Sequence, residues 1–365
     1  MRSRPEEALP GEALPGQAVP EEAVPEEARQ GEGLPVLAGR AAQRTASGSA
    51  VLGLLRERVR SGSQPGQRSD GHRIALSIEG GGMRGSVSAG MAHALYELGL
   101  LPAFDAVYGT SAGAITAAWL VSSFPEGLRG WARPDYARAL IRWRAMLRRR
   151  PVVDVRTLVE VVYQTEFPMD FGSVLASEVE WHPLGTDAVT GAATDLRPLV
   201  ADPAEVRLAL RASAGLPFLA GPAVVLRGRR YFDGGLAEPI PFRTPMAHGA
   251  THIVVLRSRP FRALPAEPPP APRPAREARF LTRTFLRRES MDLRTVYLGR
   301  TARTLADVIS VAAMEEAGTA LSIFPPLSVP RVGRLTTDGV LLEAAFEVGR
   351  KAVHGLPGIT VTTTA

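Results

Sequence analysis

The chain has 365 residues, of which 45% are hydrophobic, and this content excludes a protein that is disordered throughout. The absence of cysteine excludes disulfide scaffolds, thiol nucleophiles and cysteine-ligated zinc or iron–sulfur sites. The net charge of +6 combines an acidic start with a basic remainder, since residues 1–32 carry eight Glu against three Arg and leave +11 on the rest. A basic body suits phosphate-bearing partners, either nucleic acid or an anionic membrane.

The first 70 residues are expected to form a disordered tail and linker. Proline recurs at every fifth position from Pro5 to Pro25, and each proline removes a helical hydrogen-bond donor and restricts the residue before it. This spacing predicts an extended, solvated arm, and a repeat that binds a partner is the alternative. A short helix is expected over residues 50–59. The sequence shows neither a signal-peptide core nor a run of about 18 apolar residues, so we expect a cytoplasmic protein.

From residue 71 onwards, strands alternate with helices. Apolar residues indicate strands over 73–79 and 104–108, each followed by a helix, over 86–98 and 112–123. This order is typical of an α/β fold with a largely parallel sheet. We therefore assign residues 71–258 to one α/β domain. Its remaining helices are expected at 135–149 and 154–164, and its later strands at 178–182, 223–226, 229–232 and 251–257.

Two regions follow the α/β domain. Seven prolines between Pro260 and Pro274 indicate a surface linker or flap over residues 259–275. Residues 276–365 are expected to form a mostly helical extension that packs on the α/β domain. Its helices are predicted over 276–316 and 337–354.

An arginine-rich segment, residues 136–150, contains Trp143 among six arginines. A basic helix with tryptophan can lie on an anionic bilayer, and an amphipathic helix that packs on the core with a solvated arginine face is the alternative. The same two interpretations apply to residues 276–288. We find no nucleic-acid-binding motif, and an aromatic content of 6% gives little sign of a base-stacking platform. A peripheral contact with an anionic membrane is therefore expected, and nucleic acid is not.

A glycine-rich loop follows the first predicted strand directly. Gly80, Gly81 and Gly82 let the backbone bend sharply and aim N–H groups at one point near a helix N-terminus, where a phosphate or an oxyanion is stabilised. Gly80, Gly82 and Gly85 also fit the dinucleotide motif G-x-G-x-x-G, and Asp105 lies 20 residues further on. In a dinucleotide fold, however, the acidic residue sits at the carboxyl end of the second strand, whereas Asp105 precedes its strand.

The second predicted strand ends in a nucleophile motif. Residues 109–113 read Gly-Thr-Ser-Ala-Gly, which is G-x-S-x-G on a strand-to-helix turn. The turn is so tight that Gly109 and Gly113 nearly touch, and strain of about 1–3 kcal/mol is tolerated because it lifts the hydroxyl clear of the backbone. Ser111 is therefore the predicted nucleophile.

A base for this serine is available in Asp233, which follows the predicted strand 229–232 and precedes two glycines. An ordinary Asp-Gly turn is the structural alternative. A free aspartate has a pKa of about 3.9 and is a poor base at neutral pH, so partial burial would have to raise its proton affinity. The rival arrangement is a Ser–Asp–His triad that uses His248 or His252.

Together the three motifs resemble those of the patatin-like phospholipase family, whose pattern is G-G-G-x-R-G, then G-x-S-x-G, then D-G-A/G. The resemblance covers roughly residues 73–257. It includes residues 212–217, which are similar to the family's A-S-x-x-x-P segment, and Thr186-Asp187, which are similar to its T-D-x-x-T-G strand end. Pro239 stands where many members have asparagine in D-G-G-x-x-x-N-x-P.

The resemblance implies a three-layer α/β fold and a dyad in which Asp233 is the base for Ser111. It also implies an oxyanion hole formed by the backbone N–H groups of Gly81, Gly82 and Met83. Arg84 would hold the glycine loop or the lipid phosphate. The residues of the supporting loop and elbow are Gly80, Arg84, Gly85, Gly109 and Gly113.

The function expected from these residues is a serine acyl hydrolase. It would cleave carboxylic ester bonds of phospholipids or related acyl lipids through an acyl-enzyme, without a metal or cofactor. A lysophospholipase or neutral-lipid esterase is the nearest alternative enzyme. A catalytically silent lipid-binding or scaffold protein is the alternative from another class.

Overall fold

The computed structural model describes residues 50–148, 150–262 and 274–358. Residues 1–49, with the proline repeat of the predicted tail, lie outside the described residues, as does 263–273 of the predicted linker. A helix spans residues 50–61, which agrees with the short helix expected there. None of the described helices is both long and apolar enough to span a membrane.

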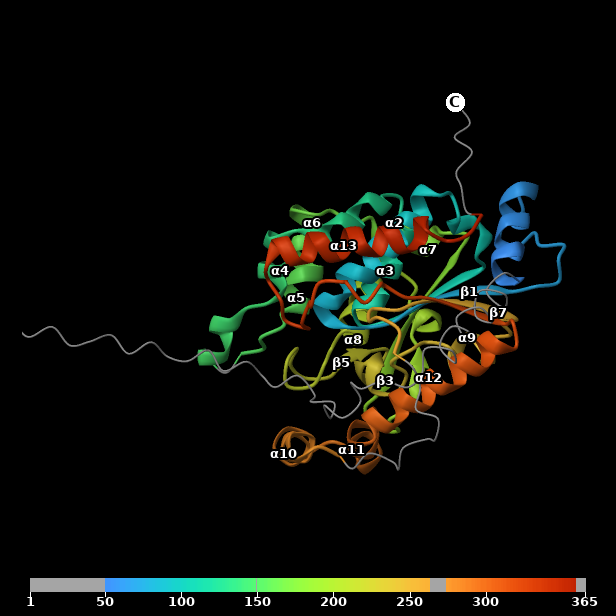
Figure 1. Cartoon of the computed structure of the whole chain (residues 1–365). Helices are drawn as coiled ribbons and strands as arrows, with labels where there is room; N and C mark the ends of the chain where they lie inside the picture. The colour runs from blue at the N-terminus through green and yellow to red at the C-terminus, as the bar shows by residue number, and fades with distance from the viewer. Residues whose placement is uncertain (1–49, 149, 263–273, 359–365) are drawn as a thin grey trace, which may run out of the picture. The chain divides into compact units, whose positions relative to one another are not determined.

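A largely parallel sheet forms the centre of the fold, in the order β5-β6-β3-β2-β1-β7-β8, with β4 paired to β3 (Figure 1). Strands β3, β2, β1, β7 and β8 run parallel, whereas β4 and β6 are antiparallel to β3 and β5 is antiparallel to β6. The expected α/β class is therefore confirmed. The strands are β1 (Ile74–Ile78), β2 (Ala106–Thr110), β3 (Glu180–Asp187), β4 (Ala193–Asp195), β5 (Val224–Leu226), β6 (Arg229–Asp233), β7 (His252–Leu256) and β8 (Ala320–Ile323).

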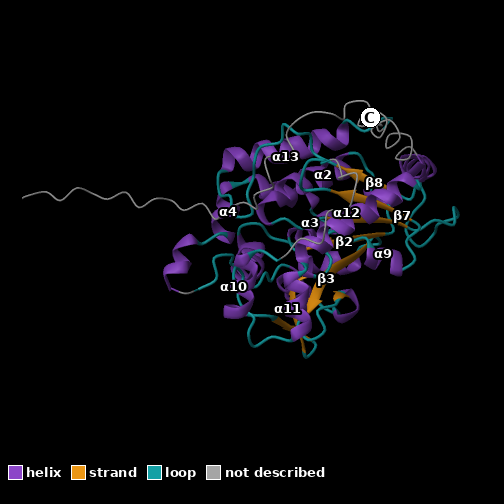
Figure 2. Cartoon of the chain, turned by 60° about the horizontal axis from the view of Figure 1, so that its bottom comes forward, coloured by secondary structure: helices purple, strands orange, loops and turns teal. Residues whose placement is uncertain are grey.

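Helices cover both faces of this sheet, which gives three layers (Figures 1 and 2). The helices α2, α3, α8 and α13 pack on one face around a core that includes Val107 and Leu256. On the other face, α12 packs through Val311 against Ala75 and Val255. The helices are α2 (Gly85–Glu97), α3 (Ala112–Val121), α4 (Pro134–Leu140), α5 (Val155–Thr157), α6 (Tyr163–Thr165), α7 (Phe171–Ala176), α8 (Pro203–Ser213), α9 (Arg243–Ala247), α10 (Arg276–Phe285), α11 (Met291–Leu298), α12 (Arg300–Glu316) and α13 (Gly339–His354).

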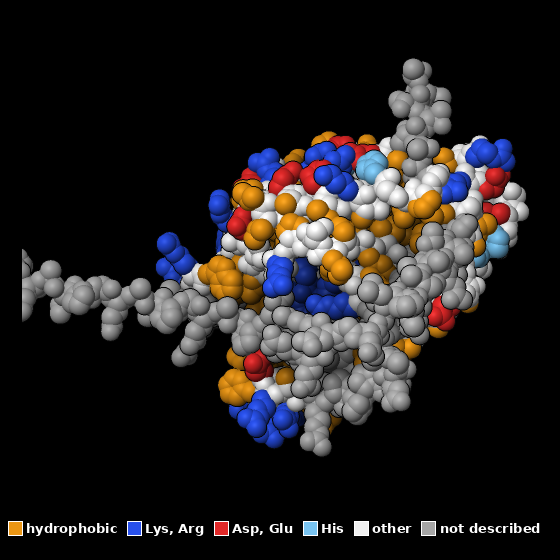
Figure 3. Space-filling model, in the orientation of Figure 1, with side chains coloured by type: hydrophobic (Ala, Val, Ile, Leu, Met, Phe, Trp, Pro, Cys, Tyr) orange, Lys and Arg blue, Asp and Glu red, His pale blue; other side chains and the backbone are white. Residues whose placement is uncertain are grey.

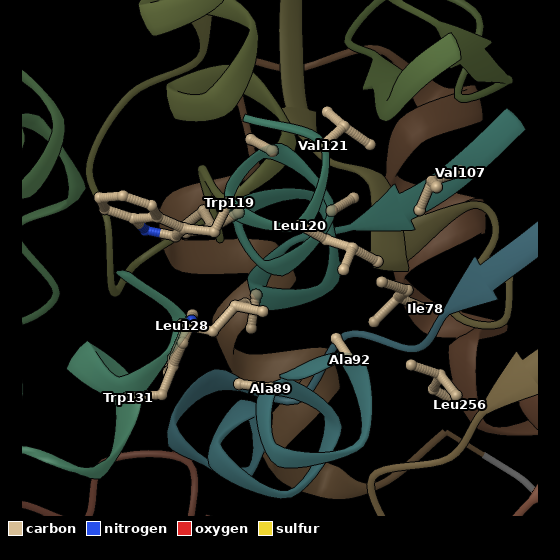
Figure 4. Packing of buried hydrophobic residues seen from close by; sticks show 14 of the residues in the cluster. Ile78, Ala89, Ala92, Val107, Trp119, Leu120, Val121, Leu128, Trp131 and Leu256 are labelled. Carbon is tan, nitrogen blue, oxygen red and sulfur yellow. The ribbon is translucent and has the colours of Figure 1, made fainter. Parts of the chain in front are cut away.

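Small residues in α2 allow this helix to pack closely against its neighbours. Figure 4 shows Ala89 and Ala92 of α2 beside Leu120 of α3 and the strand residue Ile78. A side chain at Gly90 of α2 would collide with the backbone of α13. Helices α2 and α13 can therefore approach closely, and the C-terminal region completes the helical layer over α2.

The predicted helix over 135–149 is correct only as far as Leu140 and is wrong beyond it. Helix α4 ends at Leu140, and Ile141 instead pairs with Val153 in an isolated bridge. A 3₁₀ turn, η5 (Trp143–Arg148), follows. The amphipathic pattern fits a helix, but the bridge buries Ile141 and supplies hydrogen bonds that the helix would have supplied, and this long-range pairing overrides the local preference.

Several elements have no counterpart in the sequence prediction, among them α7, α8, β4 and β8. The last is the most consequential, because β8 extends the sheet by pairing in parallel with β7. The C-terminal region therefore contributes a strand as well as helices. The strand predicted over 178–182 is also longer than expected, since β3 continues through Pro183 to Asp187.

Candidate active site

Ser111 lies in the sharp turn between β2 and α3. Its φ of 56° and ψ of −126° are unusual for a residue with a side chain, as the predicted elbow requires. A Cβ at Gly109 would come within 2.5 Å of the Gly113 carbonyl carbon, and a Cβ at Gly113 would collide with the Ile78 carbonyl oxygen. Both glycines are therefore required by close backbone approach, and the serine side chain remains partly exposed.

The backbone of Ser111 is held by Ser213, the last residue of α8. The Ser111 N–H lies 3.1 Å from both the carbonyl oxygen and the Oγ of Ser213. The Ser213 hydroxyl in turn donates to the carbonyl oxygen of Leu184 at 2.6 Å. Sequence reasoning noted this Ala-Ser segment only through the family resemblance. Its structural role is to tie the elbow to β3.

Strand register brings Asp233 to the elbow. Thr110 pairs with Leu184 on β3, and the next β3 residue, Gly185, pairs with Asp233 on β6. A side chain at Gly234 would collide with the Leu184 carbonyl oxygen, so this glycine permits close approach to β3. As a result the Ser111 hydroxyl lies close enough to the Asp233 carboxyl to help lower its pKa.

Asp233 is only 4% exposed, and this burial disfavours the ionised form of its carboxyl. Burial raises its pKa from 3.8 to about 6, although hydrogen bonds and positive charges oppose the rise. The opposing groups are the Ser111 hydroxyl, the Gly235 N–H at 2.8 Å from Oδ1, and the charges of Arg334 and Arg300. This carboxyl is consequently a stronger base than an exposed aspartate and is still mostly ionised at neutral pH.

Thr186 fixes the backbone on which Asp233 sits. Its hydroxyl donates to the Asp233 carbonyl oxygen at 2.7 Å and accepts from the Ala237 N–H at 3.2 Å. Pro239 occupies the position where the resemblance would place asparagine, and its carbonyl oxygen accepts a hydrogen bond from Thr110 at 3.3 Å. The backbone of this loop therefore contacts the residue that precedes the nucleophile.

The glycine loop lies against the elbow. A Cβ at Gly80 would be 3.1 Å from the Ser111 Cβ, and Gly82 adopts a left-handed φ of 59°. Neither Gly81 nor Gly82 donates its N–H to another described residue. The Met83 N–H, by contrast, donates to the carbonyl oxygen of Arg334 at 3.0 Å. Of the three expected oxyanion donors, two are therefore available and the third is engaged by the segment between β8 and α13.

A buried carboxylate anchors the start of this loop. Glu79 Oε2 lies 3.1 Å from Arg257 Nε and 3.0 Å from the Ser258 N–H. Burial acts to raise the pKa of Glu79, but the neighbouring arginines and the Ser258 N–H hold it below its usual value. Arg84 contributes one of these charges, which agrees with a role in holding the loop. Gly85, at the start of α2, packs against Ala112 and Trp131.

The positions of His248, His252 and Asp105 do not support the triad or the dinucleotide site that the sequence left open. His252 is the first residue of β7, at the opposite end of the sheet from Ser111, and His248 contacts Tyr108 on the other sheet face. Asp105 binds Arg58 and Arg68 and accepts the Ile74 N–H, at the opposite end of β1 from the glycine loop. Neither a Ser–Asp–His triad nor a dinucleotide site is therefore assembled.

Residues 76–246 match the family model of patatin-like phospholipases. The chain contains a patatin-like phospholipase domain. The glycine loop, the elbow and Asp233 all lie inside the matched range, so the domain carries every motif on which the resemblance rests.

The chain is also similar to proteins of Escherichia coli and of mycobacteria. The chain is 30% identical over 195 residues to the uncharacterized protein YjjU of Escherichia coli, which covers 52% of each protein. It is 29% identical over 198 residues to the uncharacterized NTE family proteins Mb1092c of Mycobacterium bovis and Rv1063c of Mycobacterium tuberculosis, which covers 50% of this chain and 46% of theirs. The chain thus spans about half the length of the curated relatives that it matches.

Basic groups surround the patatin-like site. The charges of Arg334 and Arg300 reach Asp233, and those of Arg257 and Arg84 reach Glu79. On the face drawn in Figure 3, basic side chains gather in a hollow. Positive charge near a nucleophile favours substrates that carry negative charge.

Proposed function

We propose that this protein is a serine acyl hydrolase that cleaves carboxylic ester bonds of phospholipids or related acyl lipids with a Ser111–Asp233 dyad. The observation that carries the proposal is the strand register that places a serine in a strained elbow beside a buried carboxyl whose pKa is raised to about 6. A raised pKa brings the carboxylate closer to the pH at which it must accept a proton, while it stays mostly ionised at pH 7 to 8.

The reaction proceeds in two halves. Asp233 takes the hydroxyl proton as Ser111 Oγ attacks the ester carbonyl carbon, and the N–H groups of Gly81 and Gly82 stabilise the oxyanion. The carbonyl re-forms, the alcohol leaves with the proton from Asp233, and an acyl-serine remains. Water, deprotonated by Asp233, then attacks the acyl-serine, and the fatty acid leaves as Ser111 recovers its proton.

A lipid panel tests this function against its alternatives. Purified protein is incubated with diacyl phospholipids, lysophospholipids and triacylglycerol, and released fatty acid is measured. We expect fatty acid from phospholipids, and faster release from anionic ones because of the basic groups near Asp233. Release from lysophospholipid or triacylglycerol alone would assign the alternative enzymes. No turnover of any lipid or of a chromogenic acyl ester would favour a silent lipid-binding protein.

The oxyanion assignment predicts a specific effect of Gly82→Ala. The added Cβ would lie 2.6 Å from the Arg334 carbonyl oxygen at a left-handed φ, so the loop must shift. Loss of one well-placed oxyanion donor typically costs about 10²–10³-fold in kcat. We expect a loss of that order with little change in KM, because the donor acts mainly on the transition state. Steady-state kinetics with a soluble ester measures both.

Gly99→Ala is the matched control. Gly99 has a φ of 63°, close to that of Gly82, but a Cβ there meets nothing within 4 Å. Both variants therefore carry similar backbone strain, of about 1 kcal/mol, and only Gly82→Ala disturbs the loop. Equal losses of activity in the two variants would show that strain alone is responsible and would remove the glycine loop from the oxyanion proposal.

We further propose a peripheral membrane contact through η5. Trp143 is 46% exposed there, and Arg144 and Arg148 beside it are also exposed. We expect binding to anionic vesicles to exceed binding to zwitterionic ones and to weaken as salt shortens the Debye length to about 8 Å at 0.15 M. Trp143→Ala should weaken binding about 5- to 10-fold, since it removes a large apolar side chain from the interface.

Co-sedimentation at low and high salt measures this binding, with Phe124→Ala as the control. Phe124 is also exposed, at 56%, but belongs to the turn before η4 (Pro125–Ala132) and not to η5. Equal losses in the two variants, or binding that ignores salt and lipid charge, would show that the arginines of η5 are only a solvated surface.

A further inference from the structure

Three potential metal ligands meet on the sheet face opposite α2 and α3. They are His182 of β3, Asp195 of β4 and His248, which follows α9. The His182 Nδ1 lies 2.8 Å from Asp195 Oδ2, and the His248 Nδ1 lies 3.9 Å from the same oxygen. One ligand atom from each residue falls within 4.8 Å of the others. These three residues form what we call the His–Asp–His cluster.

Strand pairing and stacking hold the cluster in place. The antiparallel register of β3 and β4 pairs Leu184 with Asp195, which brings the carboxyl close to His182, two residues earlier. Tyr108 stacks on the His182 ring with centroids 4.4 Å apart and an interplanar angle of 9°. Its hydroxyl lies 3.1 Å from the His248 Nδ1. The cluster is therefore held by two strands of the sheet and by the end of α9.

We propose that the His–Asp–His cluster binds a divalent transition-metal ion, with Zn²⁺ as the best match. Two imidazoles and one carboxylate are a donor set that suits zinc, and zinc binds such atoms at about 2.0–2.2 Å. Ligand atoms that share one ion at this distance lie roughly 3–4 Å apart, so movements of a few tenths of an ångström up to about 1 Å bring the three atoms to one ion.

The surroundings of His182 and Asp195 agree with this assignment. The Nε2 of His182 lies 3.4 Å from a carboxylate oxygen of Glu180, and a metal-binding histidine commonly donates its other ring N–H to such a group. That hydrogen bond would leave the Nδ1 lone pair directed at Asp195. The other oxygen of Asp195 already accepts the Arg197 N–H at 3.0 Å, which orients Oδ2 toward the histidines.

Burial leaves one side of the cluster open to solvent. The side chains of His182 and Asp195 are 10% and 8% exposed, whereas that of His248 is 39% exposed. An ion can therefore enter beside His248, and the fourth position remains for water or for the Tyr108 hydroxyl. Arg73, the nearby cation, is already paired with Glu180 at 2.5 Å.

Metal titration of untagged protein tests the proposal without any measure of activity. Chelator-treated and dialysed protein is titrated with Co²⁺, followed by its visible absorption, and Zn²⁺ is then used to displace it. We expect one ion per chain with a Zn²⁺ Kd on the order of 10 μM or tighter. His248→Ala and Asp195→Asn should each weaken binding at least about tenfold, because each removes a ligand.

His354→Ala is the control, since His354 lies on α13, where it pairs with Glu97, and should leave the affinity unchanged. His248 is partly exposed, so its alanine variant is expected to fold, and circular dichroism verifies that all variants do. One-to-one binding that is lost in the cluster variants and kept in His354→Ala would establish the site. Absence of binding below about 100 μM, or equal affinity in all variants, would overturn it and leave the cluster as a hydrogen-bonded network.

Discussion

Ser111→Ala is expected to lower ester hydrolysis on the order of 10⁴-fold or more, because it removes the atom that forms the acyl-enzyme. The elbow conformation, with φ of 56°, is no harder for alanine than for serine, so the variant should fold and melt like the wild type. Steady-state rates with a chromogenic acyl ester and a thermal melt measure the two effects separately.

The matched control is Ser123→Ala. Ser123 is an exposed serine just beyond the other end of α3, and its hydroxyl makes only a 3.4 Å contact with Asp170. Its alanine variant should retain full activity. Activity that persists in Ser111→Ala, after contaminating esterases have been excluded by repurification, would remove Ser111 from the mechanism.

Asp233→Asn is expected to lower kcat/KM by about 10² to 10⁴, the range that general-base removal produces. Asparagine keeps the acceptor for the Gly235 N–H but cannot accept the serine proton. His248→Ala and His252→Ala should retain most of their activity, because neither side chain lies beside the dyad. A large loss in either histidine variant would favour the triad.

The pKa of Asp233 also sets the pH dependence of the wild type. The carboxyl must be ionised to accept a proton, so kcat/KM should rise with pH through about 6 and level off above it. A midpoint near 4 would mean that burial does not perturb the catalytic carboxyl.

Stability should move in the opposite direction from activity. The folded-state pKa of about 6 is above the usual 3.8, so the folded protein holds the proton more tightly than the unfolded chain. The pH-dependent loss of folding free energy from burying the ionised carboxyl is therefore absent below pH 4 and reaches about 3 kcal/mol above pH 6. Asp233→Asn should melt at a higher temperature than wild type at pH 8, and this difference should shrink as the pH falls from 6 to 4. A variant that is less stable at pH 8 would contradict this account.

The parts of the site that sequence predicted are local in the chain. The glycine loop follows β1 directly, Ser111 follows β2, and Asp233 ends β6. Each motif combines a short strand with glycines, and the close contact of Gly109 with Gly113, four residues later, illustrates why glycine is needed. Sequence patterns of this kind are readable because their physical cause lies within a few residues.

The parts that sequence missed depend on contacts between distant segments. The Met83 N–H is engaged by the carbonyl oxygen of Arg334, a backbone group that no motif marks. The cluster of His182, Asp195 and His248 draws on two strands and a helix end, so its spacing matches no metal-binding pattern. The helix predicted over 135–149 ends early for the same reason, since Ile141 forms an isolated antiparallel bridge with Val153.

Covalent labelling distinguishes a mechanism in which Ser111 attacks the ester with Asp233 as its direct base from every other arrangement. Wild type and Asp233→Asn are treated with a fluorophosphonate. Peptide mass spectrometry locates the adduct, and intact-protein mass spectrometry at successive times measures the rate at which it forms. We expect a single adduct on Ser111, formed at least about 10²-fold more slowly in the variant. An adduct on another residue, or equal labelling rates in the two proteins, would contradict it.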